Sequence, residues 1–296
     1  MKTSRFLPFA SLLPLLLLAA PAGAAISLST YTLAGQYALP TPEAAETSGI
    51  AYDRSTNSLY VMGDTANYIV EVGLTGQYRG SMGLSGFADT EALAYYSPGK
   101  FLIAEERIQT IDRVTYADGG VAFQSASSPL ALGPFANNDG IEGLTLDPLT
   151  GDLWAVKEKN NQAIYQVQNY AGGGTSVITN PFSPAGLGLG DLSDIYALSN
   201  SHAFDQKPEG QNFLIISQQS NKLVEVNRSG QVLGTLDLSF LGKNNLEGVT
   251  MDDAGNLYIT SESPVLYVFR QTVPEASSAL LGLAAGIPLL LRRRRN

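Results

Sequence analysis

One sequence pattern recurs five times along this chain, and its period constrains the fold more than any other feature. In residues 246–262 (LEGVTMDDAGNLYITSE), an acidic residue meets glycine and an alternating apolar run follows. A turn of Asp, Gly and Asn comes next, and a second apolar run ends in an acid. Similar units occupy residues 48–64, 91–106, 142–158 and 193–218, and successive starts lie 43, 51, 51 and 54 residues apart. A period of about 40–55 residues with four strand-sized runs is typical of a β-propeller.

The five units predict an all-β, five-bladed propeller that is closed by an N-terminal strand. The last unit ends after its third apolar run, residues 265–269, so its blade lacks a fourth strand. Residues 33–37 (LAGQY) resemble residues 74–78 (LTGQY), which stand where an outermost strand belongs. We therefore expect the N-terminal strand to complete the last blade, which leaves few exposed strand edges. Six blades are the alternative, with the extra blade in residues 117–136 or 170–189, two stretches that read as loops.

The recurring aromatic residues are expected to belong to the core. They occupy strand positions in the repeat, and the single tryptophan, Trp154, is one of them. Stacking on a sugar is the minority interpretation. Residues 200–211 form a polar insertion that carries the only histidine, His202, for which we expect an exposed loop position.

The N-terminal segment, residues 1–24, has the composition of a secretory signal peptide. A basic start is followed by an apolar run and by small residues, with cleavage expected between Ala24 and Ala25. The propeller domain is then expected to cover residues 25–271. Since the chain has no cysteine, an exported propeller must be stabilised by its core without disulfides.

The C-terminal segment, residues 272–296, carries a motif, a mostly apolar run and four arginines in that order. The motif is Val273, Pro274 and Glu275, and the apolar run covers residues 279–291. A helix that starts near Val273 is long enough to span a bilayer, with the arginines on the cytoplasmic side. The three-part order resembles the PEP-CTERM sorting signal. That resemblance implies a transient inner-membrane helix, processing by signal peptidase and an exosortase, and a final place at the cell surface or in the extracellular matrix of a Gram-negative-type bacterium.

The charge of the chain excludes several classes of partner. Six of the 18 basic residues and one of the 27 acidic ones, Glu275, lie in the two terminal segments, which leaves 12 basic against 26 acidic residues, a net charge near −14. Nucleic acids and anionic lipid surfaces need a basic face, so neither is an expected partner. The acidic balance favours cations, neutral glycans or basic protein surfaces.

Aligning the five units produces two columns of acidic positions. The first opens the innermost strand and the second ends the next strand, so antiparallel pairing places both on one face of the ring. Crowded carboxylates without nitrogen or sulfur ligands favour Ca²⁺ over zinc or iron. Strand capping by the same acids is the alternative. The seven candidate ligands are Glu91, Glu142 and Glu247 in the first column, and Asp64, Glu106, Glu158 and Glu262 in the second.

These motifs resemble a known family. The opening AETSGIAYDRSTNSLYVMGD, the EGL and EGV strand starts and the five-unit layout are similar to the SdiA-regulated (YjiK-like) propeller family. The resemblance implies a five-bladed propeller, exported or membrane-associated, with a calcium site on the channel. Its acidic strand starts correspond to Glu91, Glu142 and Glu247, whereas the fourth unit has Ser193 and Asp194 instead.

Two functions are compatible with this sequence. The first is a calcium-binding surface protein that binds an extracellular polymer, glycan or protein. The second is a Ca²⁺-dependent hydrolase of lactones, esters or phosphoesters, with Glu106, Glu158 or Glu262 as the base and Lys157 or Arg107 holding an anionic substrate. A Ser-His-Asp triad has only His202 to draw on, and no GxSxG motif is present.

Overall fold

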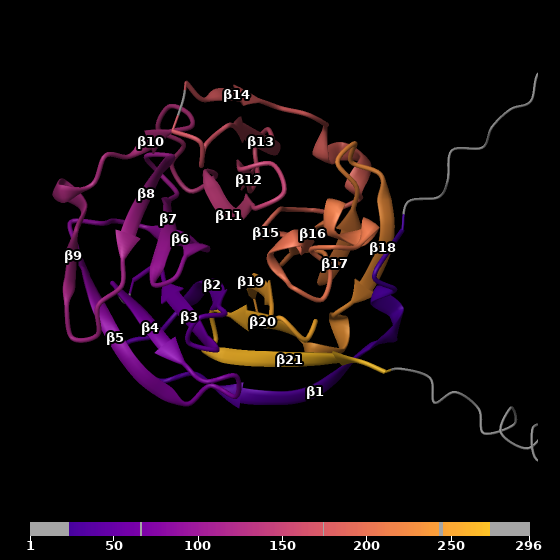
Figure 1. Cartoon of the computed structure of the whole chain (residues 1–296), viewed down its shortest axis with the longest axis horizontal. Coiled ribbons are helices and arrows are strands. Elements are labelled where there is room, and N and C mark those ends of the chain that lie inside the picture. The colour runs from indigo at the N-terminus through magenta and orange to yellow at the C-terminus, as the bar shows by residue number, and fades with distance from the viewer. Residues whose placement is uncertain (1–23, 66, 174, 243–244, 273–296) are drawn as a thin grey trace, which may run out of the picture.

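The chain folds into five β-sheets arranged around a central axis (Figure 1). The computed structural model describes residues 24–272 except residues 66, 174 and 243–244, and the statements below concern that part of the chain. Each sheet is one blade, and its strands follow one another in sequence from the centre outward, apart from β9, β10 and β1. The predicted five-bladed propeller is confirmed, and the six-bladed alternative is wrong.

Blades 1 and 2 come from residues 47–131. Blade 1 has a fifth, outermost strand, β9, which pairs parallel to β5 after the chain has formed the three inner strands of blade 2. The strands of blade 1 are β2 (Thr47–Asp53), β3 (Ser58–Gly63), β4 (Tyr68–Val72), β5 (Tyr78–Ser85) and β9 (Val121–Phe123). Those of blade 2 are β6 (Thr90–Ser97), β7 (Lys100–Glu105), β8 (Thr110–Thr115) and β10 (Leu130–Ala131), with the 3₁₀ helix η2 (Gln124–Ala126) between β9 and β10.

Blades 3 and 4 follow with four strands each. Blade 3 contains β11 (Ile141–Asp147), β12 (Asp152–Lys157), β13 (Ala163–Gln168) and β14 (Val177–Thr179), and η3 (Pro184–Leu187) leads out of it. Blade 4 contains β15 (Asp194–Ala197), β16 (Phe213–Ser217), β17 (Lys222–Val226) and β18 (Val232–Asp237), with η4 (Leu198–Asn200) and η5 (Pro208–Gln211) in the polar insertion and η6 (Ser239–Leu241) after β18.

Blade 5 joins the two ends of the propeller. Its inner three strands are β19 (Leu246–Met251), β20 (Leu257–Ser261) and β21 (Val265–Gln271), and its outer strand is β1 (Tyr31–Ala38), which follows η1 (Leu28–Thr30). β1 and β21 run antiparallel from Tyr31 opposite Gln271 to Ala38 opposite Val265. The sequence-based prediction that an N-terminal strand closes the ring is therefore confirmed.

The two stretches that read as loops in the sequence also contain short outer strands. β9 and β10 lie in residues 117–136, and β14 lies in residues 170–189. Each has only two or three residues, so no alternating pattern can develop among the surrounding Gly, Ser and Pro. Pairing with the preceding strand in the folded blade, rather than local sequence, makes these residues extended.

The hydrophobic core is divided into five clusters, and each cluster lies between two neighbouring blades. Alternate side chains of one strand enter different clusters: Leu59 and Val61 face blade 5, whereas Tyr60 and Met62 face blade 2. Trp154 lies between blades 3 and 4, 2 % exposed, with its ring centroid 4.5 Å from that of Phe213. The prediction that Trp154 belongs to the core is confirmed.

The terminal expectations fall almost entirely outside the described residues. This applies to the signal peptide up to residue 23 and to the sorting segment from Val273 onward, including Pro274 and Glu275. Within the described part of the chain, no helix has the length and apolar character needed to cross a membrane.

Removing the Trp154 ring is expected to test the importance of the interfaces between blades. Trp154→Ala should lower the free energy of unfolding by about 3–5 kcal/mol, because it leaves a cavity between blades 3 and 4. Phe135→Ala, at a ring that is 64 % exposed, should change it by less than about 0.5 kcal/mol. Urea unfolding followed by circular dichroism measures both values, and equal losses would contradict an inter-blade core.

Candidate functional site: an acidic pocket at one mouth of the channel

The first acidic column lies at a β-bulge that recurs in four blades. In blade 2, Thr90 pairs with Glu105 and Ala92 pairs with Ala104, so Glu91 between them has no partner across the strand. Ser48, Glu142 and Glu247 are skipped in the same way in blades 1, 3 and 5. A bulge re-aims the side chain of its extra residue. Here it directs the first column toward the channel mouth.

Close approach of the inner strands explains why glycine follows the bulge in three blades. A Cβ atom on Gly49 would lie 2.6 Å from the backbone nitrogen of Leu93 in the next blade. A Cβ atom on Gly143 would lie 2.4 Å from the Cα of Asp194, again in the next blade. Both distances are shorter than a Cβ atom tolerates, so the Gly of the SGI start in blade 1 and of the EGL start in blade 3 is required by blade-to-blade packing.

The second acidic column is positioned by one repeated backbone hydrogen bond. The N–H of Glu106 donates to the carbonyl of Asp89, two residues before Glu91, at 2.9 Å. The N–H groups of Asp64, Glu158 and Glu262 make the equivalent bond in blades 1, 3 and 5, at 3.2, 3.0 and 3.1 Å. The end of the second strand is thereby held beside the bulge of the first.

All seven predicted carboxylates line one cavity at this end of the channel. The cavity has a volume of about 180 Å³, and we call it the acidic pocket. The residues that line it are Asp64, Glu91, Glu106, Asn138, Glu142, Glu158, Lys159, Gln218, Glu247 and Glu262. The prediction that the two columns converge is thus confirmed in geometry, whereas ion binding stays a proposal.

Burial and repulsion by neighbouring carboxylates raise the pKa values of the Asp64, Glu91 and Glu106 carboxyls. Desolvation is the main cause in each case, and neighbouring carboxylates add to it. The pKa rises to about 6 for Asp64, to about 7 for Glu106 and to about 8 for Glu91. Burial also raises the pKa of Glu142 and Glu247 well above the usual range. At neutral pH, the pocket therefore holds both ionised carboxylates, such as Asp64, and protonated carboxyls, such as Glu91.

Two groups of carboxylates are close enough to share an ion. One oxygen each from Glu106, Glu142 and Glu158 lies within 4.8 Å of the others, and Asp64, Asp89 and Glu91 form a second such group. Glu106 is also fixed from the protein side, because its Oε1 accepts the N–H of Gly140 at 3.0 Å. The buried Oδ1 of Asp64 has no hydrogen-bond partner among the described residues. This oxygen is available to a ligand.

The basic residue in the pocket is not the one that the sequence suggested. Lys157 ends β12 and donates to three backbone carbonyls, those of Asp139, Lys159 and Asn160. Arg107 is half exposed and pairs with Asp89 at 2.7 Å. Neither residue lines the acidic pocket, and the expectation that one of them holds a substrate stays a prediction.

Lys159 supplies the positive charge instead, since its ammonium contacts the carboxylate of Glu158. Sequence reasoning missed Lys159 because it lies just beyond the end of β12, where the alternation of side chains along a strand no longer predicts which way a side chain points. Two amide side chains, Asn138 and Gln218, also line the pocket. Gln218 occupies the second column of blade 4, so the alignment of the repeats already contained that signal.

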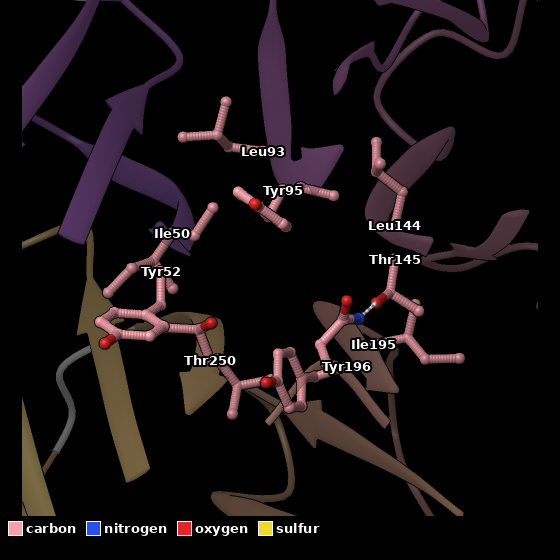
Figure 2. A pocket seen from close by; sticks show the side chains of 13 residues that line it. Ile50, Tyr52, Leu93, Tyr95, Leu144, Thr145, Ile195, Tyr196 and Thr250 are labelled. Carbon is pink, nitrogen blue, oxygen red and sulfur yellow. Dashed lines mark hydrogen bonds between the residues drawn. The ribbon is translucent and has the colours of Figure 1, made fainter. Parts of the chain in front are cut away.

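Below the acidic pocket, the channel is closed by apolar side chains. A ring of five aliphatic residues, one from each inner strand, lines a space of only about 20 Å³ together with tyrosine, threonine and asparagine side chains (Figure 2). Its members are Ile50, Leu93, Leu144, Ile195 and Val249. The ring is a low-dielectric floor, which adds to the cost of charging the carboxylates above it.

Asp194 explains why blade 4 departs from the repeat. Its carboxylate is buried and accepts the N–H of Val249 in blade 5 and of its own neighbour Ile195, each at 2.8 Å. Burial raises the pKa of Asp194 well above its usual range. The side chain joins two inner strands inside the channel wall and does not line the acidic pocket.

The only histidine lies at the other mouth of the channel. His202 is 52 % exposed, its Nδ1 lies 3.2 Å from a carboxylate oxygen of Asp253, and it also contacts Arg54. Arg54 and Asp253 belong to the turns after β2 and β19, at the ends of these strands opposite the bulges. The predicted exposed loop position is confirmed, and His202 is too far from the carboxylates to act with them.

Comparison with known proteins agrees with this architecture. The model of the SdiA-regulated family matches residues 24–270. The chain belongs to the SdiA-regulated family. The match covers all five blades and the closing strand.

A solved structure with a TM-score above 0.5 shows the same fold at low sequence identity. Glutaminyl cyclase from Myxococcus xanthus is 13 % identical, with a TM-score of 0.55 over 82 % of this chain and 97 % of that one. Virginiamycin B lyase from Staphylococcus aureus is 15 % identical, with a TM-score of 0.43 over 79 % and 69 % of the two chains. At these identities the likeness concerns the fold and not the chemistry.

The raised pKa values predict a stability that falls as pH rises. Between the ordinary glutamate value of 4.5 and about 8, folded Glu91 retains a proton that the unfolded chain releases. The native state then binds more protons than the unfolded state, so the free energy of unfolding declines across this range. We expect a higher melting temperature at pH 5 than at pH 8 when metal ions are chelated.

Glu142→Gln should raise the melting temperature at pH 8, by about 2–4 °C for each kcal/mol of repulsion removed, and change it little at pH 5. Asp118→Asn is the matched control, because Asp118 is exposed and its Oδ1 accepts the N–H of Ser81, a bond that asparagine keeps. A Glu142→Gln protein that melts no higher than the native protein at pH 8 would contradict repulsion in the pocket.

Proposed function

We propose that this protein is an exported calcium-binding propeller that acts as a binding or structural component of the cell envelope or extracellular matrix. The observation that supports it is the convergence of seven carboxylates on one pocket in which Lys159 supplies the only ammonium group among the described residues. Such a concentration of like charge is costly unless a cation reduces it. The pocket therefore has the electrostatics of a cation site.

Calcium is the ion that suits these residues. The lining residues offer carboxylate and amide oxygens, and neither histidine nor cysteine is among them. Ca²⁺ takes about 6–8 oxygens at about 2.3–2.6 Å in flexible geometry. Oxygens on opposite sides of such an ion stand about 4.8 Å apart. The oxygens of Glu106, Glu142 and Glu158 lie within that separation of one another.

Lys159 gives the proposed site a built-in competitor. Its ammonium holds Glu158, so an ion that binds Glu158 has to displace this contact. A mobile ammonium is a reversible occupant, because it can return to solvent on its long side chain. The pocket can thus keep part of its charge compensated when calcium is scarce.

Export and sorting complete the proposal and are supported by the terminal sequences. Signal peptidase is proposed to cut between Ala24 and Ala25, and an exosortase to process the segment that begins at Val273. The protein would pass through the inner membrane transiently and reach the surface of a Gram-negative-type bacterium. Extracellular calcium concentrations suit weak sites of this kind, with dissociation constants of about 10⁻⁴–10⁻³ M.

Thermal unfolding with and without calcium tests the site. Calcium at about 100 times its dissociation constant should add roughly 2.7 kcal/mol of stability, which appears as a rise of about 5–10 °C in the melting temperature. The double substitution Glu91→Gln/Glu247→Gln should remove most of this rise, because it takes two ligands from the pocket. Differential scanning calorimetry of residues 25–271 in chelator and in about 10–100 mM Ca²⁺, which is about 100 times the expected dissociation constant, provides the comparison.

The control is Asp118→Asn, which should keep the full rise. A native protein that shows no rise and carries no metal by elemental analysis would overturn the calcium site. The acidic columns would then be strand caps that accept backbone N–H groups, as Glu106 does from Gly140.

A second candidate function is a Ca²⁺-dependent hydrolase, and the pKa values favour it. Glu106, at about 7, and Glu91, at about 8, titrate in the range where a carboxyl group both accepts and donates protons at neutral pH. When bound, calcium would polarise a substrate oxygen. Glu106 would accept a proton from water, and the Lys159 ammonium would orient an anionic group of the substrate.

A substrate panel separates the two functions. The hydrolase predicts turnover of a lactone, an aryl ester or a phosphoester that falls about 100-fold or more in Glu106→Gln. The panel should include an N-terminal glutaminyl peptide, because glutaminyl cyclase from Myxococcus xanthus shares the fold. Calcium binding without turnover of any substrate would leave the binding role and discard the hydrolase.

A further inference from the structure

The structure contains a buried carboxylate for which no cation is visible. Glu225 on β17 is fully buried, and both of its oxygens accept the N–H of Ile26, at 3.2 and 3.0 Å. Asn212 donates its side-chain N–H to Oε1 at 2.8 Å. Among the described residues, no lysine or arginine pairs with Glu225, and burial raises its pKa. All its hydrogen-bond donors are neutral.

The Ile26 segment is a short arm that joins blade 5 to blade 4. Ile26 and Leu28 are buried in the cluster between these blades, and η1 packs beside β18 (Figure 1). On the blade 5 side, Gln271 donates to the carbonyl of Ile26 at 3.1 Å, and Thr272 donates to the carbonyl of Thr30 at 2.9 Å. The arm thus runs from blade 5, in which the ring closes, to blade 4.

The expected cleavage site lies directly beside Glu225. The carbonyl of Ala24 accepts a hydrogen bond from Asn212 at 2.7 Å, and the same amide group donates to Glu225. The nitrogen of Ile26 is hydrogen-bonded to the Glu225 carboxylate. Backbone nitrogens of consecutive residues lie about 3–4 Å apart, so the nitrogen of Ala25 lies one residue away from this hydrogen bond. Hydrolysis of the Ala24–Ala25 bond consumes one water and leaves a carboxylate on Ala24 and an ammonium on Ala25.

We propose that cleavage between Ala24 and Ala25 creates the missing cation, and that the α-ammonium of Ala25 pairs with Glu225 and locks the N-terminal arm across the ring closure. The proposal rests on the removal of residues 1–24 that export requires. The carboxyl group of Glu209, whose charge also acts on Glu225, increases the attraction for a cation. Processing then stabilises the exported form of the propeller and not its precursor.

The physical reason is the cost of an unpaired charge in the interior. A buried carboxylate without a counter-charge is strongly destabilising, whereas a hydrogen-bonded ion pair offsets much of its desolvation. An α-amino group has a pKa of about 7.7–8.0 and is mostly charged at neutral pH. Before cleavage, the same nitrogen is a neutral amide that provides no such compensation.

The cleavage is tested on the full-length chain. Expression of residues 1–296 in a Gram-negative bacterium, followed by N-terminal sequencing and intact mass of the exported product, should show Ala25 as the first residue. Any other first residue would overturn the proposed position of the ammonium.

The pairing is tested on residues 25–272, which contain all five blades and the closing strand, with a free or an acetylated N-terminus. Acetylation removes the charge and supplies a carbonyl in the place of that of Ala24. Glu225→Gln should lower the melting temperature of the free chain by about 5–10 °C and that of the acetylated chain by less than half as much. Equal losses in the two chains would overturn the pairing whatever the result with calcium.

Glu71→Gln is the matched control for this cycle. Glu71 occupies the equivalent position on β4 in blade 1, opposite Tyr60 as Glu225 is opposite Leu214, and it accepts the hydroxyl of Ser58. Its substitution should shift the melting temperature of the free and acetylated chains by the same amount. A difference as large as that seen with Glu225→Gln would mean that acetylation acts on the whole fold, and it would overturn the specific pair.

Discussion

The close approach of the five inner strands around the axis is the constraint on which the rest of the molecule depends. Backbones of neighbouring blades come so near that Gly49 and Gly143 leave no room for a Cβ atom. The residue before each glycine is bulged out of the strand pairing, and its side chain is directed toward the channel mouth. The packing that builds the ring is therefore also what crowds the carboxylates.

The two mouths of the channel have different chemistry because the aliphatic ring separates them. On one side, desolvation and repulsion raise the pKa of Glu91 and its neighbours, and Lys159 offsets part of the charge. On the other side, His202 and Arg54 meet the carboxylate of Asp253 near solvent. An acidic pocket and a surface that combines both signs of charge thus lie at opposite ends of the channel.

Two separate contacts of the N-terminal segment hold the ring of blades closed. Each core cluster lies between two blades, so an open junction between blades 4 and 5 would expose one cluster to water. The β1–β21 pairing closes blade 5, and the arm with Ile26 extends the closure to blade 4. Glu225 stands at the end of that arm, where a processed N-terminus offers the opposite charge.

The amino-acid sequence by itself determined the five blades, the closing strand and the two acidic columns. These features follow from the sequence repeat and from the alternation of side chains along each strand, and both can be recognised within a single repeat unit. Tertiary structure decided what depends on contacts between blades: that Lys159 and not Lys157 enters the pocket, and that Asp194 bonds neighbouring strands. The short strands β9, β10 and β14 belong to the same group, because pairing alone makes them extended. A repeat specifies where each residue lies within a blade, but charge compensation and close approach arise only when the blades meet.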